Sequence, residues 1–395
     1  MVMWKSAAGL MTVAFVFQRL ISQHAFGFGA LVVFPAKPSP NETMAAVFYE
    51  KHGSTAVLQY SDKYARPLLK PNQVLVRVVF SSINPCDFKT RRNPDAGAAI
   101  PKPKIPGEDI AGTIVDSNGH AKWPDGRRVA AMMPIVGSRW GSAAEYVAVD
   151  VEALAVIPDG VSLEQAAALP LTSLTAVQAL EKVKDLVRRD GTTPEIKLKK
   201  RILIQAGAGG VGSFAIQYAK HVLGMHVIAT ASRAKSEMLQ SWGCDEVIDY
   251  TTTSFEEVLA EHPVDIVLDT MSWAYEERTL SSKVVKPGGY YLNILSSDWG
   301  FPDNKEVANG LTTIKNVIKS IIVPSSLFVH YSLVTVQPNG KMLQQILDLV
   351  TESKIIPIID SVYPLRSAQD AYERLESGRA TGKILLNHTI ASSNE

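Results

Sequence analysis

The chain has 395 residues, of which 46% are apolar and 20% charged, and its formal net charge is +1. This length is sufficient for two domains, and the composition is that of an ordinary globular protein. The near-neutral charge and the short Lys/Arg runs argue against a nucleic-acid partner, and two cysteines, Cys86 and Cys244, are too few for a disulfide framework or a four-cysteine zinc site.

Residues 1–43 have the profile of a targeting segment. They contain no acidic residue before Glu42, and the apolar run Ala7–Phe17 follows Lys5. The run is too short for a transmembrane helix, which needs about 20 apolar residues. We therefore expect an organelle address, plastid or mitochondrial, with peripheral contact with a membrane left open. The alternative is an unprocessed N-terminus, and a cytoplasmic protein if translation starts at Met44.

Short apolar runs separated by turn residues follow, and they predict a small β-rich domain. Strands are expected at Ala45–Phe48, Val74–Phe80, Ile110–Val115, Arg128–Ala131 and Ala143–Val149. From Ser162 the pattern changes to helical. Leu163–Leu169 is preceded by a serine N-cap, and Thr172–Leu186 is long enough for a second helix.

Strands and helices then alternate, which predicts a parallel sheet covered by helices on both faces. The expected strands are Arg201–Ala206, His226–Thr230, Glu246–Asp249, Ile266–Asp269 and Gly289–Leu295. The helices expected between them are Val211–Leu223, Lys235–Ser241, Phe255–Ala260 and Tyr275–Val285. Near the C-terminus the expected elements are two helices and a strand, Lys341–Val350, Ser367–Glu376 and Ile384–Leu386.

The predicted fold is therefore α/β, with a doubly wound parallel sheet inserted into a β-rich domain. The Rossmann domain is expected to span residues 173–324. The β-rich catalytic domain is expected to combine residues 44–172 with residues 325–395. The catalytic cleft is expected between the two domains, where clefts usually form.

A glycine-rich loop, Gly207-Ala208-Gly209-Gly210-Val211-Gly212, joins the first strand of the alternating region to its helix. This is the context that a dinucleotide-binding fingerprint requires. Gly207 is expected to make the tight turn, Gly209 to admit the pyrophosphate, and Gly212 to allow close helix–strand packing. Gly210 and Val211 open the helix, whose N-terminus attracts phosphate. The alternative is a glycine turn that binds nothing.

The residues after the second strand favour NADPH over NADH. NAD-binding folds place an acidic residue there, whereas residues 230–235, Thr-Ala-Ser-Arg-Ala-Lys, contain none. Ser232, Arg233 and Lys235 could hold a 2′-phosphate by charge-assisted hydrogen bonds. Arg233 could equally be a solvated loop residue.

Four stretches together resemble the zinc-less quinone oxidoreductase and enone reductase branch of the medium-chain dehydrogenase/reductase superfamily. They are Asn84–Lys89, Pro106–Gly112, Leu169–Ala176 and Ala206–Gly212, and the tail Ser377–Ile384 is also typical. Within this branch the chain is similar to chloroplast-envelope quinone oxidoreductase homologues, plant furanone reductases and mitochondrial reticulon-interacting proteins. The resemblance implies that the β-rich catalytic domain is GroES-like.

The resemblance also implies which residues form the catalytic site. Zinc alcohol dehydrogenases of the superfamily carry a catalytic Cys and a Gly-His-Glu, where this chain has Asn84 and Gly107-Glu108-Asp109, so no metal is expected. Asn84 is expected to position the reactants. Lys89 is expected to donate a hydrogen bond to substrate or ribose, unless it is a surface lysine. Asp87 is expected to orient Lys89 or to cap a helix.

Further cofactor contacts are implied by position in the family. Thr175 is expected near the nicotinamide ribose, and Tyr250 near the adenosine phosphate. Leu327, Phe328 and Val329 are expected near the nicotinamide amide. Ser232 and Lys235 also match the branch at the 2′-phosphate.

The expected activity is hydride transfer from NADPH to an α,β-unsaturated carbonyl or a quinone. Hydrogen-bond donors would stabilise the developing enolate oxygen, and the α-carbon would take a proton from solvent or a nearby acid. The alternative is a non-catalytic NADPH-binding redox sensor or organelle assembly factor, and an alcohol dehydrogenase is a more distant one. A homodimer is expected by analogy with the family alone.

Overall fold

The computed structural model describes residues 38–92, 101–135, 137–184, 199–271, 275, 278–280, 282–294 and 329–389. All described residues belong to one compact unit, Ala36–Glu395. Within these residues the strands form a two-stranded, a six-stranded and a seven-stranded sheet. No described helix is both long and apolar enough to cross a membrane.

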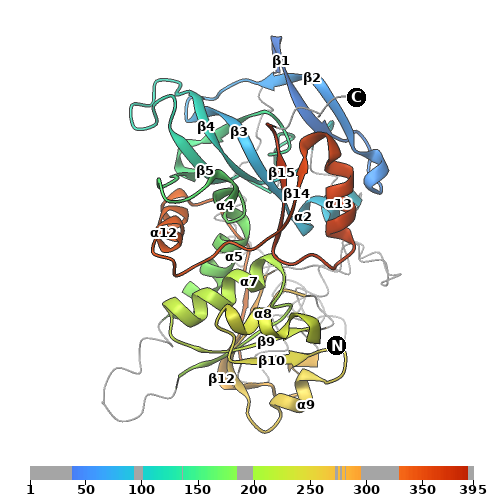
Figure 1. Cartoon of the computed structure of the whole chain (residues 1–395), viewed down its shortest axis with the longest axis vertical. Coiled ribbons are helices and arrows are strands. Elements are labelled where there is room, and N and C mark those ends of the chain that lie inside the picture. The colour runs from blue at the N-terminus through green and yellow to red at the C-terminus, as the bar shows by residue number, and fades with distance from the viewer. Residues whose placement is uncertain are drawn as a thin grey trace, which may run out of the picture. The chain divides into compact units, whose positions relative to one another are not determined.

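The seven-stranded sheet forms the predicted β-rich domain (Figure 1). Its strands are β3 (Gln73–Ile83), β4 (Asp109–Asp116), β5 (Arg128–Met132), β6 (Tyr146–Asp150), β7 (Leu154–Val156), β14 (Ile359–Pro364) and β15 (Lys383–Asn387). The order is β14–β15–β3–β4–β5–β7, with β6 also paired to β3. In β3, alternate valines Val74, Val76 and Val78 are buried, as expected for a strand with one face in the core. Because β15 pairs Ile384 with Ile83, the C-terminal strand reaches the end of β3.

Helices α4 (Leu163–Ala167) and α13 (Ala368–Glu376) pack against this sheet, and α2 (Pro85–Arg92) packs against α13. The predicted N-cap of α4 is confirmed, because the Ser162 hydroxyl accepts from the Gln165 N–H and the Gln165 side chain accepts from the Ser162 N–H, both at 3.0 Å. A separate antiparallel ribbon joins β1 (Pro38–Phe48) and β2 (Gln59–Pro67). The pattern does not predict β2, since its sequence is largely polar.

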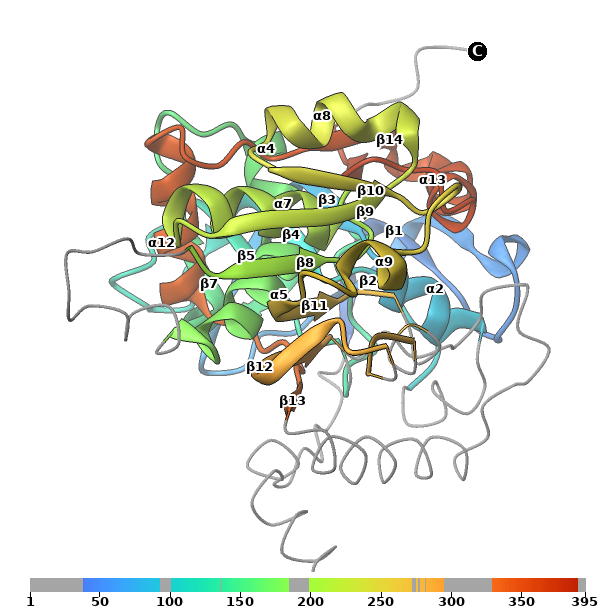
Figure 2. The ribbon, with the colours of Figure 1, turned by 90° about the horizontal axis from the view of Figure 1, so that it is seen from below.

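The six-stranded sheet is parallel throughout, as the alternation predicts. Its strands are β8 (Arg201–Ile204), β9 (His226–Ala231), β10 (Glu246–Asp249), β11 (Val264–Asp269), β12 (Val285–Asn293) and β13 (His330–Leu333). Their order is β10–β9–β8–β11–β12–β13, and Figure 2 shows most of these strands side by side. This is the strand order of the Rossmann fold, in which a ligand crevice opens where the order reverses, beside the first strand. That strand is β8.

Both faces of the parallel sheet are covered, which confirms the predicted fold class. Ile202 and Ile204 of β8 belong to one buried cluster together with α7 (Gly210–Gln217). Leu203, which points to the other face, belongs to a second cluster together with α9 (Phe255–Leu259). A strand buried on both sides needs apolar residues at consecutive positions, and this is why its sequence shows no alternation.

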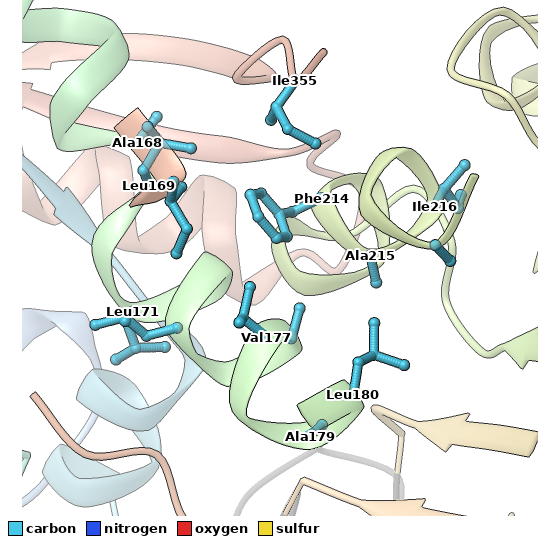
Figure 3. Close-up of a cluster of buried hydrophobic side chains, with 14 of the residues drawn as sticks. Ala168, Leu169, Leu171, Val177, Ala179, Leu180, Phe214, Ala215, Ile216 and Ile355 are labelled. Atoms are coloured by element: carbon cyan, nitrogen blue, oxygen red, sulfur yellow. The ribbon is translucent and has the colours of Figure 1, made fainter. Parts of the chain in front are cut away.

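The first of these clusters also joins the two sheets. It contains Ala111 of β4 and Met132 of β5 as well as the apolar side chains of β8. Between the sheets lie α7 and α5 (Pro170–Glu181), and Figure 3 shows Phe214 of α7 pointing toward Val177 of α5. The dinucleotide loop, which opens α7, is therefore held against the β-rich domain by a continuous core.

Some element boundaries differ from the prediction. Helix α5 begins at Pro170 rather than Thr172, because proline is well suited to the first turn. The predicted helix Val211–Leu223 is not continuous. Its first part is α7, and a π-helical turn follows at Tyr218–Val222. Strand β12 begins at Val285, four residues before the predicted Gly289. The parallel sheet continues to β13, and the domain boundaries at residues 43, 172 and 324 remain predictions.

The remaining described helices are α8 (Ser236–Ser241), which contacts β10, and α12 (Gly340–Thr351), which contacts β7 and α5. Helix α12 is strongly amphipathic, with Leu343, Ile346 and Leu347 buried. It lies between β13 and β14 in the sequence, so the chain returns through it from the parallel sheet to the seven-stranded sheet.

Candidate active site

The glycine-rich loop leaves the carboxyl end of β8 in a tight turn. Ala206 has a φ of +49°, which is uncommon for a residue with a side chain. Two hydrogen bonds to Thr230 of β9 hold it there. The Thr230 hydroxyl accepts from the Ala206 N–H at 3.0 Å, and the Thr230 carbonyl accepts from the Gly207 N–H at 2.9 Å. The turn is thus fixed by the neighbouring strand.

Three glycines of the loop are required by close approach, and a Cβ at Gly207 would lie 2.8 Å from the Cβ of Ala229. A Cβ at Gly212 would lie 2.4 Å from the Ala206 carbonyl oxygen, so the helix could not pack on the turn. A Cβ at Gly210 would lie 2.9 Å from Cγ2 of Thr172 and 3.1 Å from Cδ of Lys383. Gly209 is the N-cap of α7, and Val211 lies in its first turn, where the N–H groups have no partner in the helix.

The structure brings Ser232 and Tyr250 to one edge of the parallel sheet. They directly follow Ala231 and Asp249, which face each other across β9 and β10. The Tyr250 N–H donates to the Ala231 carbonyl at 3.3 Å, while its side chain is largely exposed. Ser232 and Tyr250 are thus neighbours at the carboxyl end of the sheet.

Lys235 lies close to the same edge and contacts the C-terminal tail. Its Nζ donates to the carbonyls of Arg379 and Ala380, both at 3.4 Å. Partial burial lowers the pKa of Lys235, and the nearby Asp360 carboxylate opposes this shift. Both hydrogen bonds are long, so the Lys235 ammonium is only weakly bound by these two carbonyls.

A cavity of about 280 Å³ opens beside Tyr250. It is lined by Tyr250, Thr252, Thr253, Ser254, Phe255, Tyr275 and Arg278. The Arg278 guanidinium lies 5.0 Å from the Phe255 ring centroid and forms an ion pair with Glu256. The lining therefore combines hydroxyl groups, aromatic rings and a guanidinium.

A second group of candidate residues forms a buried hydrogen-bond network with Asp109 at its centre. Its side chain is fully buried. One carboxylate oxygen accepts from the Ser82 hydroxyl at 2.8 Å, the Asn84 amide at 2.9 Å and Lys383 Nζ at 3.1 Å. The other oxygen accepts from the Leu171 N–H at 2.7 Å. A buried carboxylate with four donors is well satisfied.

Lys383 completes this network from the C-terminal strand. Its ammonium donates to the Ile83 carbonyl at 3.0 Å, to Oδ1 of Asn84 and to Asp109, so three donors meet three acceptors. The preceding residue, Gly382, donates its N–H to the Ala208 carbonyl at 2.9 Å. The tail therefore connects the dinucleotide loop directly to Asn84.

Sequence reasoning did not select Lys383 or Asp109 as site residues. A signal was present, because Lys383 directly precedes the apolar run Ile384–Leu386 and a lysine is almost never buried unless it is paired. The sequence does not show which carboxylate is the partner, because 274 positions separate the two residues.

The other catalytic candidates lie on α2 and α5. Asp87 caps α2, as predicted, because its carboxylate accepts from the Asn84 N–H at 2.8 Å. Lys89 is buried, with 9% of its surface exposed, and is therefore not a surface lysine. Thr175 is also buried, and its hydroxyl donates to the Leu171 carbonyl within α5 at 2.7 Å.

The predicted contacts to the nicotinamide amide lie at the edge of the described region. Leu327 and Phe328 fall outside the described residues. Val329 immediately precedes β13 and packs against the buried cluster on the second face of the parallel sheet.

A second buried polar cluster lies beside Asn84. The Cys86 thiol donates to Glu108 at 3.4 Å, and the Glu108 carboxyl is hydrogen-bonded to Asp87. Burial and the Asp87 charge raise the pKa of Glu108 well above its usual range, and burial lowers the pKa of Lys104, which faces it. Burial likewise raises the pKa of the Cys86 thiol.

These residues do not fit a catalytic zinc ion. The Asn84 amide is bonded at one end to Asp109 and at the other to Lys383, so it offers no ligand. The cluster of Cys86 and Glu108 includes the Lys104 side chain, whose positive charge would repel a cation. A zinc ligand must also be deprotonated, whereas burial favours the protonated forms of this thiol and this carboxyl.

Known proteins share both the sequence and the fold. The alcohol dehydrogenase GroES-like domain matches residues 70–159, and the zinc-binding dehydrogenase model matches residues 242–386. A 2-methylene-furan-3-one reductase from Solanum lycopersicum is 34% identical over 359 residues, which cover 88% of this chain and 80% of the relative. The chain belongs to the medium-chain dehydrogenase/reductase superfamily, in its quinone oxidoreductase and enone reductase branch.

Two further members of this branch extend the comparison. The NADPH-dependent alkenal/one oxidoreductase, chloroplastic, of Arabidopsis thaliana is 32% identical over 374 residues, covering 93% of this chain and 85% of the relative. The solved quinone oxidoreductase from Coxiella burnetii superimposes with a TM-score of 0.73 at 26% identity, covering 88% of this chain and 99% of that one. The medium-chain dehydrogenase/reductase fold therefore extends over nearly all of the described residues.

Proposed function

We propose that this protein is an NADPH-dependent reductase that transfers hydride to an α,β-unsaturated carbonyl or a quinone. The observation that carries the proposal is the edge formed by β8, β9 and β10. There a glycine-rich loop lies beside Ser232, Lys235 and Tyr250, and residues 230–235 contain no carboxylate. The names of the tomato and Arabidopsis relatives support the substrate class.

The residues of this edge fit NADPH. The N–H groups of Gly210 and Val211 would bind the pyrophosphate at the start of α7, beside Gly209, whose own N–H donates to the Ala206 carbonyl at 2.9 Å. Ser232, Lys235 and Tyr250 would hold the 2′-phosphate, since an ammonium and a hydroxyl are suitable donors for a dianion. Gly207 and Gly212 would shape the turn and are not assigned a contact with the cofactor. When bound, NADPH supplies the hydride.

At the other end of the cofactor, the protein supplies hydrogen bonds rather than a metal. The Asn84 amide would position the reactants through the network of Asp109 and Lys383, while Lys89 and Thr175 would lie near the nicotinamide ribose. Val329 would contact the carboxamide, with Leu327 and Phe328 assigned by sequence position alone. We propose that the reaction is zinc-independent, because a carbonyl conjugated to a double bond needs only donors for its developing oxyanion.

The proposal is tested with an NADPH-oxidation assay on the purified chain. Substrates would include an alkenal, a vinyl ketone and a quinone, and zinc would be measured by elemental analysis on the same sample. Turnover of at least one electrophile without stoichiometric zinc is the expected result. NADPH binding without turnover of any substrate would refute the reductase and support a non-catalytic NADPH-binding protein. Stoichiometric zinc would refute the metal-free mechanism.

We further propose that the protein acts in an organelle and forms a homodimer. The name of the Arabidopsis relative includes a chloroplast location, and residues 1–43 contain a basic, acid-free segment. Fusing residues 1–43 to a fluorescent protein tests the location, and a diffuse cytoplasmic signal would contradict it. Light scattering of the purified chain tests the dimer. Flotation with liposomes tests for peripheral membrane contact.

A further inference from the structure

A buried pair of carboxyl groups, Asp87 and Glu108, lies beside the hydrogen-bond network of Asn84. Glu108 is 3% exposed and lies immediately before Asp109, the centre of the network that holds Asn84. Polar atoms of Cys86, Asp87 and Glu108 all lie within 4.8 Å of one another. Two carboxyl groups this close cannot both be ionised at low cost, so one of them keeps a proton.

The hydrogen bonds identify the carboxyl group that keeps it. Asp87 accepts from the Asn84 N–H at 2.8 Å, from the Tyr372 hydroxyl at 3.0 Å and from the Gly107 N–H at 3.2 Å. Three donors thus favour the ionised form of Asp87, and the remaining lone pair of the carboxylate can accept a hydrogen bond from Glu108. Glu108 has no such set of backbone donors, and it is bonded to Asp87. The proton therefore resides on Glu108.

A small cavity adjoins this carboxyl group. It is lined by Tyr49, Asp87, Thr90, Lys104, Pro106, Glu108 and Ile135, and it leaves about 10 Å³ for the centre of a water molecule. Ile135 and Cys86 both pack against the core that contains Leu171 and joins the two sheets. One wall of the cavity, at Ile135, thus borders the core that joins the β-rich domain to α5 and α7.

We propose that Glu108 supplies the proton that completes enone reduction, passing it through a water molecule in this cavity. The inference rests on the proposed reductase function. After the hydride has formed the C–H bond at the β-carbon, the substrate is an enolate whose α-carbon needs a proton. The Glu108 O–H bond breaks, the water passes one proton to the α-carbon, and the C–H bond forms there. Glu108 is left as a carboxylate, and solvent returns the proton.

The surroundings of Glu108 suit such exchange. The titratable and charged groups that interact with it come from several elements, and they are Tyr49, Cys86, Asp87, Lys104, Asp109 and Tyr372. The coulombic attraction of Lys104 favours the carboxylate of Glu108 once the proton has left. Tyr49 and Lys104 are held together by reciprocal backbone hydrogen bonds of 2.9 Å, so this wall of the cavity is rigid.

Two kinds of substrate, one protonated on carbon and one on oxygen, distinguish a proton donor from a structural residue. A carbanion-like α-carbon is protonated slowly without a positioned acid, whereas a quinol oxygen takes a proton readily from water. Glu108→Gln keeps the size and hydrogen-bonding capacity of the side chain but removes its acidic proton. We expect kcat for an alkenal to fall about 100-fold, with kcat for a quinone and the Kd for NADPH changed less than about threefold.

The matched control is Glu145→Gln, a half-buried glutamate at the start of β6 that contacts Arg77. It should leave both activities unchanged. Infrared spectra of the cofactor-free protein provide a readout that does not depend on activity. The wild type should show a protonated carboxyl band at neutral pH that is absent from Glu108→Gln.

Three results would overturn the inference: an equal loss of alkenal and quinone turnover, no loss of either, or the absence of the infrared band from the wild type. A wild type that reduces neither substrate would instead refute the reductase function, and the proton role with it. If Glu108→Gln fails to fold, the pH profile of the wild type decides. Alkenal turnover should decline at high pH, where Glu108 loses its proton, while quinone turnover should not.

Discussion

Replacing Lys383 by methionine tests how the C-terminal strand supports the site. Methionine keeps the apolar stem of the side chain but removes the ammonium. The Ile83 carbonyl, Oδ1 of Asn84 and Asp109 each lose a donor. Asp109 is left as a buried carboxylate without its countercharge.

The cost can be judged from the contacts that remain. Breaking a buried ion pair by removing one partner typically costs about 3–5 kcal/mol. Asp109 keeps the donors from Ser82, Asn84 and Leu171, so we expect the lower end of that range, a loss of about 3 kcal/mol in the free energy of unfolding. Adding Asp109→Asn removes the stranded charge. The double variant should therefore be at least about 1 kcal/mol more stable than the sum of the single losses predicts.

Urea unfolding of the cofactor-free chain, followed by tryptophan fluorescence, measures these differences. The midpoints should shift while the slopes stay constant. Lys286→Met is the control, because it breaks a half-exposed pair with Asp265 at 3.2 Å and should cost less than about 1 kcal/mol. If Lys383→Met is as mild as Lys286→Met, or if the double-mutant coupling is near zero, the ion pair does not stabilise the site as argued.

Three further predictions concern the cofactor edge and the pH dependence of stability. Gly212→Ala should destabilise the fold by about 1–3 kcal/mol in urea unfolding, because its Cβ would lie 2.4 Å from a backbone oxygen, whereas Gly160→Ala, whose Cβ has no neighbour closer than 4.0 Å, should be nearly neutral. Lys235→Glu should weaken NADPH binding by about 10- to 100-fold and NADH binding far less in calorimetric titrations, and equal losses would contradict the 2′-phosphate assignment. Burial lowers the pKa of His388 from 6.5 to about 3, so its neutral form is favoured in the fold, and the stability it contributes is present above pH 6.5 and lost as the pH falls toward 3. His388→Asn should therefore flatten the dependence of the urea midpoint on pH within that window, and an unchanged slope would rule this out.

The parallel sheet was predictable because its signal is local. Ile202–Ile204 is apolar at every position, and the glycine loop follows it at once, so strand, turn and helix are all visible within a dozen residues. The strand β2 gives no such signal, since its burial depends on pairing with β1 rather than on its own residues.

The site was predictable only in part, because its polar partners lie far apart in the chain. The loop and Ser232 follow from spacing along one βαβ unit. The Asn84–Asp109–Lys383 network depends on β3, β4 and β15 lying side by side, which a single sequence does not specify. Glu108 and Lys104 are only four positions apart, but their protonation depends on their burial around Pro106. Lysine and glutamate are usually exposed, so a single sequence does not predict this burial.

The bridge between Gly209 and Gly382 has a consequence for how the protein is made. The two residues are separated by 173 positions, so at about 5–20 residues per second the ribosome adds the second one roughly 10–35 s after the first. During that interval the dinucleotide loop exists without the strand that ties it to Asn84. The loop therefore reaches its final support only after Gly382 has been synthesised, and a chain that stops before Gly382 would have the fingerprint without its connection to Asn84.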